Sequence, residues 1–74
     1  MTFQEVIAHR LSEAGHTILN VKVDREASLY GGPATEVVVL REFGSGSREE
    51  ILTITKANQV SAEGFARIFT SYLR

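Results

Sequence analysis

The spacing of the apolar residues changes twice along this chain, and that change is what most constrains the fold. Near the N-terminus apolar residues recur every three or four positions, in the middle they alternate with polar residues, and after residue 60 the first spacing returns. The first spacing places apolar side chains on one face of a helix, and alternation places them on one face of a strand. The sequence therefore predicts a helix at each end and strands between them.

The first helix has clear signals at both ends. Thr2 and Glu5 have the spacing of a capping box, in which each side chain satisfies a free backbone N–H of the other residue. The apolar stripe of this helix consists of Phe3, Val6, Ile7, Leu11 and Ala14. Gly15 can adopt the left-handed conformation that closes a helix. We therefore expect a helix that begins after Thr2 and ends at Gly15.

Three segments in the middle of the chain are predicted to be strands, although the alternation of apolar and polar residues fails in the second of them. They are Thr17–Asp24, Thr35–Phe43 and Glu50–Lys56. Gly44–Ser47, between the last two, is rich in glycine and predicts a hairpin turn. Arg25–Ala34, between the first two, contains Gly-Gly-Pro and predicts a loop. The short connections favour an antiparallel meander with the second strand at its centre.

The second helix is predicted to begin at Ser61, a residue type that caps helices. Val60 before it and Phe65 four residues into the helix are placed to form a hydrophobic staple. The apolar face consists of Phe65, Ile68, Phe69, Tyr72 and Leu73, with Ala62 and Ala66 beside them. Because this face is broader than that of the first helix, we expect it to contribute most to the core.

These elements predict an α+β fold in a single domain over residues 1–74. The order is helix, three-stranded antiparallel meander, helix (αβββα), with both helices on one face of the sheet. A domain this small has a small core, and the chain has no cysteine with which to form a disulfide. Its stability must therefore come from the core or from an interface with another chain.

The second strand carries more apolar residues than one sheet face can hold. We expect the helices to cover Leu19, Val21, Val23, Leu52 and Ile54. Residues 37–40 are consecutive aliphatics, and neighbours in a strand point to opposite faces, so one pair must point away from the helices. The sequence leaves open which pair this is. The outward pair is either tolerated in a central strand or part of a docking surface, and on the second interpretation we assign partner binding to Val38, Leu40 and Ile51.

Two further residues are candidates for partner binding. Tyr30, next to Leu29 in the glycine-flanked 25–34 segment, would act as an aromatic anchor. Arg10 falls within the apolar stripe of the first helix. Its stem either covers the edge of the core while its guanidinium group reaches a carboxylate, or it faces a partner.

Few residues have a spacing that suggests chemistry. His9, Glu13 and His16 resemble metal ligands on one helix face, but the glycine before the last of them would end the helix. We therefore expect His9 and Glu13 to form a solvated pair. Glu49 and Glu50 point to opposite faces of a strand and cannot share a proton. We expect no enzyme activity, no metal and no cofactor.

The charge balance disfavours nucleic acid as a partner. Eight basic and nine acidic residues give a formal net charge of -1 with histidine neutral. Such a chain lacks the broad basic field that supplies most non-specific affinity for nucleic acids. We therefore expect another protein to be the partner.

The order of elements nevertheless resembles that of double-stranded-RNA-binding domains. In that family the loop between the first two strands carries a Gly-Pro motif that enters a minor groove, and Gly32-Pro33 stand in the corresponding segment here. The lysine cluster that the family places at the start of its last helix is replaced by Asn58, Gln59, Ser61 and Glu63. The resemblance implies the architecture. It also supplies an alternative function, which is RNA binding through Lys22, Arg25, Lys56 and Arg67.

The leading interpretation is a non-catalytic protein-binding module, such as a small inhibitor of the kind that phages encode against bacterial defence machinery. It would act through the open sheet face and the 25–34 segment. A further alternative is a structural subunit that assembles as a homo-oligomer, for instance a homodimer. No apolar run approaches the ~20 residues that span a bilayer, and the N-terminus lacks a signal-peptide pattern, so we expect no membrane partner and a cytoplasmic location.

Overall fold

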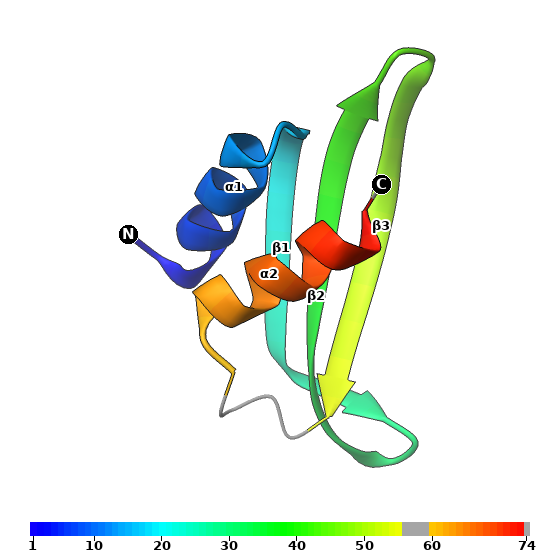
Figure 1. Ribbon diagram of the computed structural model, residues 1–74. Coiled ribbons are helices and arrows are strands. Elements are labelled where there is room, and N and C mark those ends of the chain that lie inside the picture. Colours follow the sequence, from blue (N-terminus) through cyan, green and yellow to red (C-terminus); the bar gives the residue numbers. More distant parts are fainter. Residues whose placement is uncertain (56–59, 74) are drawn as a thin grey trace.

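The chain forms a helix, three strands and a second helix, in the order that the sequence predicts. The computed structural model describes residues 1–55 and 60–73 (Figure 1). The elements are α1 (Phe3–Glu13), β1 (Thr17–Leu29), β2 (Gly32–Phe43), β3 (Gly46–Thr55) and α2 (Ala62–Tyr72). The strands form one antiparallel sheet in the order β1-β2-β3. The predicted αβββα meander is therefore confirmed. Neither α1 nor α2 has the length and apolar character needed to cross a bilayer.

Both helices begin at the predicted caps. The backbone N–H of Glu5 donates to Thr2 Oγ1 at 3.2 Å, and the backbone N–H of Thr2 donates to Glu5 Oε1 at 3.1 Å. The hydrogen bond that the Thr2 backbone N–H donates to the Glu5 carboxylate holds the pKa of this carboxyl below its ordinary value of 4.5, because it stabilises the charged form. Gly15 has a φ of +100°, which closes α1 as expected. At the other helix, Ser61 Oγ accepts a hydrogen bond from the backbone N–H of Gly64 at 3.0 Å.

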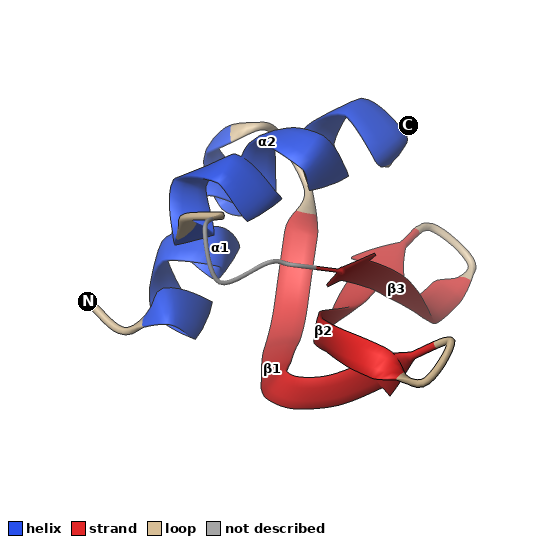
Figure 2. Ribbon diagram, turned by 90° about the horizontal axis from the view of Figure 1, so that it is seen from below, coloured by secondary structure: helices blue, strands red, loops and turns tan. Residues whose placement is uncertain are grey.

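The core lies between the helices and one face of the sheet. Its buried residues are Ile7 and Leu11 of α1, Val37 and Val39 of β2, and Phe65, Phe69 and Leu73 at α2. Figures 1 and 2 show both helices on the same side of the sheet, where α2 runs across the strands. Val37 and Val39 have no exposed surface, because β2 is the central strand and its inward side chains lie beneath α2. Val60 packs against this cluster, where the staple prediction places it.

The predicted loop over Arg25–Ala34 is wrong. β1 continues to Leu29 and β2 begins at Gly32, so only Tyr30 and Gly31 form the turn. The pairing register shifts between Asp24 and Ala27, which identifies a bulge at the two residues between them. A bulge leaves extra residues unpaired and bends the strand without ending it. The Gly32-Pro33 pair therefore lies in β2, opposite Leu29 and Ser28, and not in a free loop.

A second bulge overturns the prediction for Leu19. The register shifts between Ile18 and Asn20, so Leu19 has no direct partner in β2, and it is 51% exposed. Ile18 packs against the core instead. Strict alternation counted from Val21 toward the N-terminus would place Leu19 on the helix side of the sheet. The bulge inserts one extra residue, so the residues that precede it, including Ile18, lie on the face opposite the one that alternation assigns to them. The predictions for Val21, Val23, Leu52 and Ile54 are confirmed, since all four pack against the core.

Candidate functional site

The side of the sheet opposite the helices is called here the open sheet face, and its residues follow from the pairing register. Three rows cross it, namely Lys22–Val38–Ile51, Asn20–Leu40–Glu49 and Asp24–Glu36–Thr53. Since Val37 and Val39 are buried toward the helices, Val38 and Leu40 point the other way. The question that the sequence leaves open is thus answered: the outward aliphatic pair of β2 is Val38 and Leu40.

Three aliphatic residues form what we call the apolar centre of this face: Val38, Leu40 and Ile51. Val38 and Ile51 are direct cross-strand partners, and Leu40 lies two residues further along β2. Ile51 is 54% exposed, whereas Val38 and Leu40 are half-buried. Both helices lie on the other side of the sheet (Figure 2), so they do not cover these side chains. The structure therefore brings three of the five predicted partner-binding residues together on one surface.

Charged residues surround the apolar centre. Lys22 lies opposite Val38 on β1, Glu49 lies opposite Leu40 on β3, and Glu36 precedes Val38 on β2. An apolar patch with a polar rim is the usual composition of a protein–protein interface. Because the rim contains both signs of charge, it does not form the uniformly basic surface that a nucleic acid would need.

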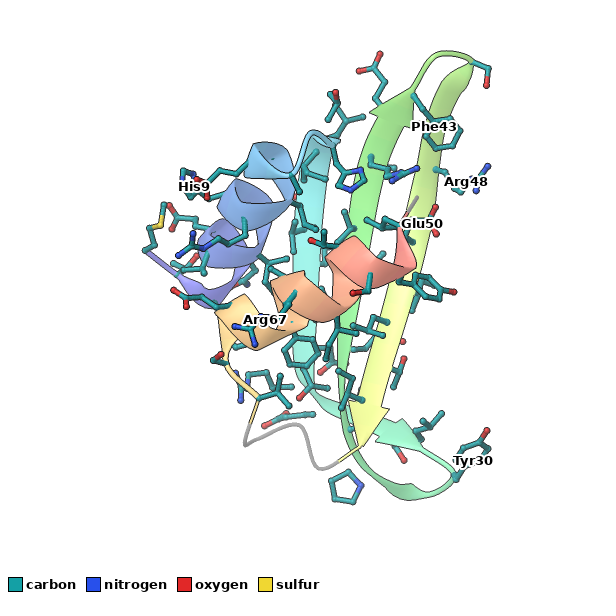
Figure 3. The ribbon with its side chains drawn as sticks, viewed as in Figure 1. His9, Tyr30, Phe43, Arg48, Glu50 and Arg67 are labelled. Carbon is teal, nitrogen blue, oxygen red and sulfur yellow. The ribbon has the colours of Figure 1, made fainter. Side chains whose placement is uncertain are left out.

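Tyr30 lies at the tip of the β1–β2 hairpin, at the end of the sheet opposite Phe43 (Figure 3). Its side chain is 98% exposed. Its φ is +54° and that of Gly31 is +78°, so both central residues of the turn have the positive φ of a type I′ turn. This conformation costs a bulky residue about 1–3 kcal/mol. A side chain this exposed forms almost no contacts within the domain that could offset the cost.

Arg10, the fifth predicted partner-binding residue, lies away from the apolar centre. Its guanidinium nitrogens are 3.4 Å from Glu13 Oε1 and 3.3 Å from Glu63 Oε1, so it links α1 to α2 on the helix side. This geometry agrees with the interpretation in which the guanidinium group reaches a carboxylate. All three side chains are about half exposed, and such pairs contribute at most about 1 kcal/mol.

The cationic residues that the RNA-binding alternative requires lie on separate surfaces of the described part of the chain. Lys22 belongs to the open sheet face. The guanidinium carbon of Arg25 lies 4.7 Å from the centre of the Phe3 ring, and Arg67 lies on α2 beside α1 (Figure 3). Lys56 is outside the described residues. Lys22, Arg25 and Arg67 thus do not form one basic surface.

The residues that resemble metal ligands are separated in the same way. His9 Nε2 lies 3.3 Å from Glu13 Oε1 on exposed α1 surface, which is the pair that the sequence predicts. His16 lies beyond the end of α1, and its Nδ1 is 3.0 Å from a guanidinium nitrogen of Arg41. Within residues 1–55 and 60–73, no three His, Asp or Glu side chains are close enough together to hold a metal ion.

Glu49 and Glu50 occupy opposite faces of the sheet. Glu49 pairs with Leu40 on the open sheet face, and Glu50 pairs with Val39 on the helix side. The sequence predicts this separation from their adjacency in a strand. The two carboxyl groups therefore do not form a shared acid–base site.

One cluster on the helix side was missed by the sequence analysis. Arg41 and Arg48 are direct cross-strand partners next to the β2–β3 turn, and both guanidinium groups lie over the ring of Phe43. The signal was present in the sequence. Once Gly44 and Ser45 are assigned as the turn, the two arginines are equally far from it and must face each other.

Comparisons of the chain with protein-family models, with curated proteins and with solved structures found no match. The function proposed below therefore rests on the residues of this chain.

Proposed function

We propose that this chain is a non-catalytic protein-binding module, which contacts its partner through the open sheet face and the Tyr30 hairpin tip. The observation that carries the proposal is Tyr30. It places a large aromatic side chain almost wholly in solvent, on a backbone conformation that destabilises the folded domain.

The fold itself gives no reason for a tyrosine at this turn. Asn-Gly at positions 30 and 31 would form the same type I′ turn with a favourable backbone. Exposed tyrosine is, however, among the residue types that dominate the energetics of protein interfaces. A residue that costs stability within the domain and contacts little of it is best explained by a contact outside the domain.

The apolar centre provides a second, separate support. Val38, Leu40 and Ile51 place aliphatic surface on a face that the helices do not cover. Tyr30 lies in the turn just before β2, and the six residue steps from Gly32 to Val38 along this strand correspond to roughly 20 Å. An interface of standard size, about 800 Å² on each partner, extends over that distance. One partner can therefore contact both features.

We extend the proposal to an inhibitor-type protein of the kind that phages direct against bacterial defence machinery. Such a protein needs a binding surface but no catalytic group, because it acts by covering a functional surface of its target. The apolar centre of the open sheet face and the charged residues around it support this role. The partner is then a folded protein with an apolar patch of matching size.

Tyr30→Asn will raise the stability of the isolated domain while it weakens partner binding. We expect the free energy of unfolding to rise by about 1 kcal/mol, the low end of the cost of a left-handed tyrosine, because asparagine accepts positive φ. Urea denaturation measures this change. Affinity capture from extracts of the native host, followed by mass spectrometry, measures binding, and the proteins retained by the wild type should be lost.

Ile68→Ala is the control for this experiment, since Ile68 is a partly exposed apolar residue on α2, far from the hairpin tip. It should retain the same proteins as the wild type. A Tyr30→Asn variant that is more stable and still captures every one of those proteins would contradict the role given to Tyr30. A Tyr30→Asn variant with a lower free energy of unfolding than the wild type would contradict the claim that the left-handed backbone of Tyr30 destabilises the domain.

Self-association would cover the same surface with a second copy of the chain. Sedimentation equilibrium at two concentrations distinguishes a homodimer from a chain that binds a different protein. With a different protein as partner, the purified chain sediments at the monomer mass of 8.2 kDa at both concentrations. A mass that doubles with concentration, and that Val38→Asp returns to the monomer value, would assign the open sheet face to a homodimer instead.

A further inference from the structure

The Arg41–Arg48 cluster is positively charged and incompletely paired. Two guanidinium groups lie directly opposite each other across β2 and β3, an arrangement of like charges that destabilises a sheet. Among residues 1–55 and 60–73, the carboxylate nearest to this pair is that of Glu50, whose oxygen is 3.6 Å from an Arg48 nitrogen. That distance is too long for a hydrogen bond. These three side chains, two arginines and one glutamate, together carry a net charge of +1.

Arg41 forms a hydrogen bond through one terminal nitrogen, but its Nε lacks an acceptor among the described residues. One of its terminal nitrogens lies 3.0 Å from His16 Nδ1, and because a guanidinium group can only donate, this histidine nitrogen accepts. The Nε of Arg41 is buried and has no acceptor among the described residues. A buried donor without an acceptor costs about 1–3 kcal/mol, more when the group is charged. The cluster therefore lacks acceptor atoms as well as negative charge.

A cavity of about 340 Å³ opens at this cluster, lined by Arg41, Arg48, Glu50, Tyr72 and Leu73. Figure 3 shows Phe43, Arg48 and Glu50 in succession along the turn end of β2 and β3. The Phe43 ring lies 4.6 Å from the guanidinium carbon of Arg48 and 5.2 Å from that of Arg41. Stacking on an aromatic ring limits the movement of a guanidinium group and leaves its N–H edges free to donate.

We propose that this cavity binds a single carboxylate group. A carboxylate is planar and accepts paired N–H donors from guanidinium groups, and one such group would neutralise the local charge. The side chain of Glu50 is only 16% exposed and lies at the site, so it would repel a dianion more strongly than a monoanion. The site lies on the helix side of the sheet and is independent of the open sheet face.

NMR titration of the ¹⁵N-labelled protein tests this site. The probes are N-acetyl-glutamate amide and its neutral isostere N-acetyl-glutamine amide. We expect the acidic probe to shift the Nε–Hε signals of Arg41 and Arg48 in a saturable manner and the neutral probe to leave them unchanged. Equal shifts with both probes, or shifts that do not saturate, would overturn the proposal.

Substitutions at Arg48 and Arg67 test whether the acidic probe binds in this cavity. Arg48→Gln should weaken the acidic probe at least tenfold, and Arg48→Lys should weaken it to a lesser extent, because lysine keeps the charge but not the planar pair of donors. Arg67→Gln, which removes an exposed arginine of α2, should bind as the wild type does. Equal weakening by the Arg48 and Arg67 substitutions would show non-specific attraction and contradict the site.

Two further probes identify the source of the carboxylate. Acetate that binds as tightly as the acidic probe supports a free small carboxylate, and a clear preference for the capped glutamate supports a peptide side chain. Dimethyl phosphate serves as a probe for a nucleic-acid backbone. If it binds more tightly than either carboxylate, the assignment to a carboxylate is wrong.

Discussion

Replacing Phe65 with alanine will lower the free energy of unfolding by about 3–5 kcal/mol. Phe65 has no exposed surface and lies in the core cluster that joins both helices to β2. Its ring also contacts that of Phe3, with centroids 5.7 Å apart. Small single-core domains rarely exceed about 3–5 kcal/mol in total, so we expect Phe65→Ala to be largely unfolded at 25 °C. Circular dichroism and urea denaturation measure the change.

Ile68→Ala provides the comparison for Phe65→Ala within the same helix. Ile68 is 41% exposed, so its truncation should cost no more than about 1 kcal/mol. A Phe65→Ala variant that remains as stable as Ile68→Ala would contradict the placement of the core between α2 and the sheet.

Aspartate at position 39 will prevent folding, whereas aspartate at position 38 will not. Val39 is fully buried against the helices, where an unpaired carboxylate costs several kcal/mol. Val38 is its neighbour on β2 but belongs to the open sheet face, where Lys22 lies directly opposite. We expect Val38→Asp to remain folded, with a loss of about 1 kcal/mol from the lower strand propensity of aspartate.

Dispersion of the amide signals in NMR spectra distinguishes the two variants of β2. A folded Val39→Asp protein, or an unfolded Val38→Asp protein, would show that the faces of the central strand are exchanged. With the predicted result, Val38→Asp is a folded variant in which the apolar centre is altered, and it should no longer bind the partner.

The sequence predicts the helices and the existence of the β2–β3 hairpin correctly because their signals are local. The turn is shorter than the predicted Gly44–Ser47, since β3 begins at Gly46 and not at Glu50. The capping pair Thr2 and Glu5, the cap Ser61 and the Gly44–Ser45 turn each act within a few residues. The β1–β2 hairpin is mispredicted as a loop because Gly31-Gly32-Pro33 is a loop signal and because the bulge interrupts the alternation in β1. Asp24 Oδ1 accepts the backbone N–H of Glu26 at 2.9 Å there, and this local bond stabilises the irregular segment within a continuing strand.

The alternation of residues in β2 does not reveal which of its side chains form the open sheet face. Alternation places residues 37 and 39 on one face and 38 and 40 on the other, but it does not say which face the helices cover. That choice depends on packing against Phe65 and Phe69, which lie far away in the sequence. The positive φ of Tyr30 also depends on the bulge, because the bulge decides where the two-residue turn falls.

Cysteine labelling tests the exposed apolar centre most directly. The chain has no native cysteine, so a maleimide reports one engineered position at a time. Ile51→Cys lies in the apolar centre and Arg67→Cys lies on α2, and both native side chains are exposed. Host extract with its own thiols blocked supplies the partner. We predict that the extract slows the labelling of Ile51→Cys at least tenfold and leaves the labelling rate of Arg67→Cys unchanged. Equal labelling rates at position 51 with and without extract would contradict the assignment of the open sheet face to a partner.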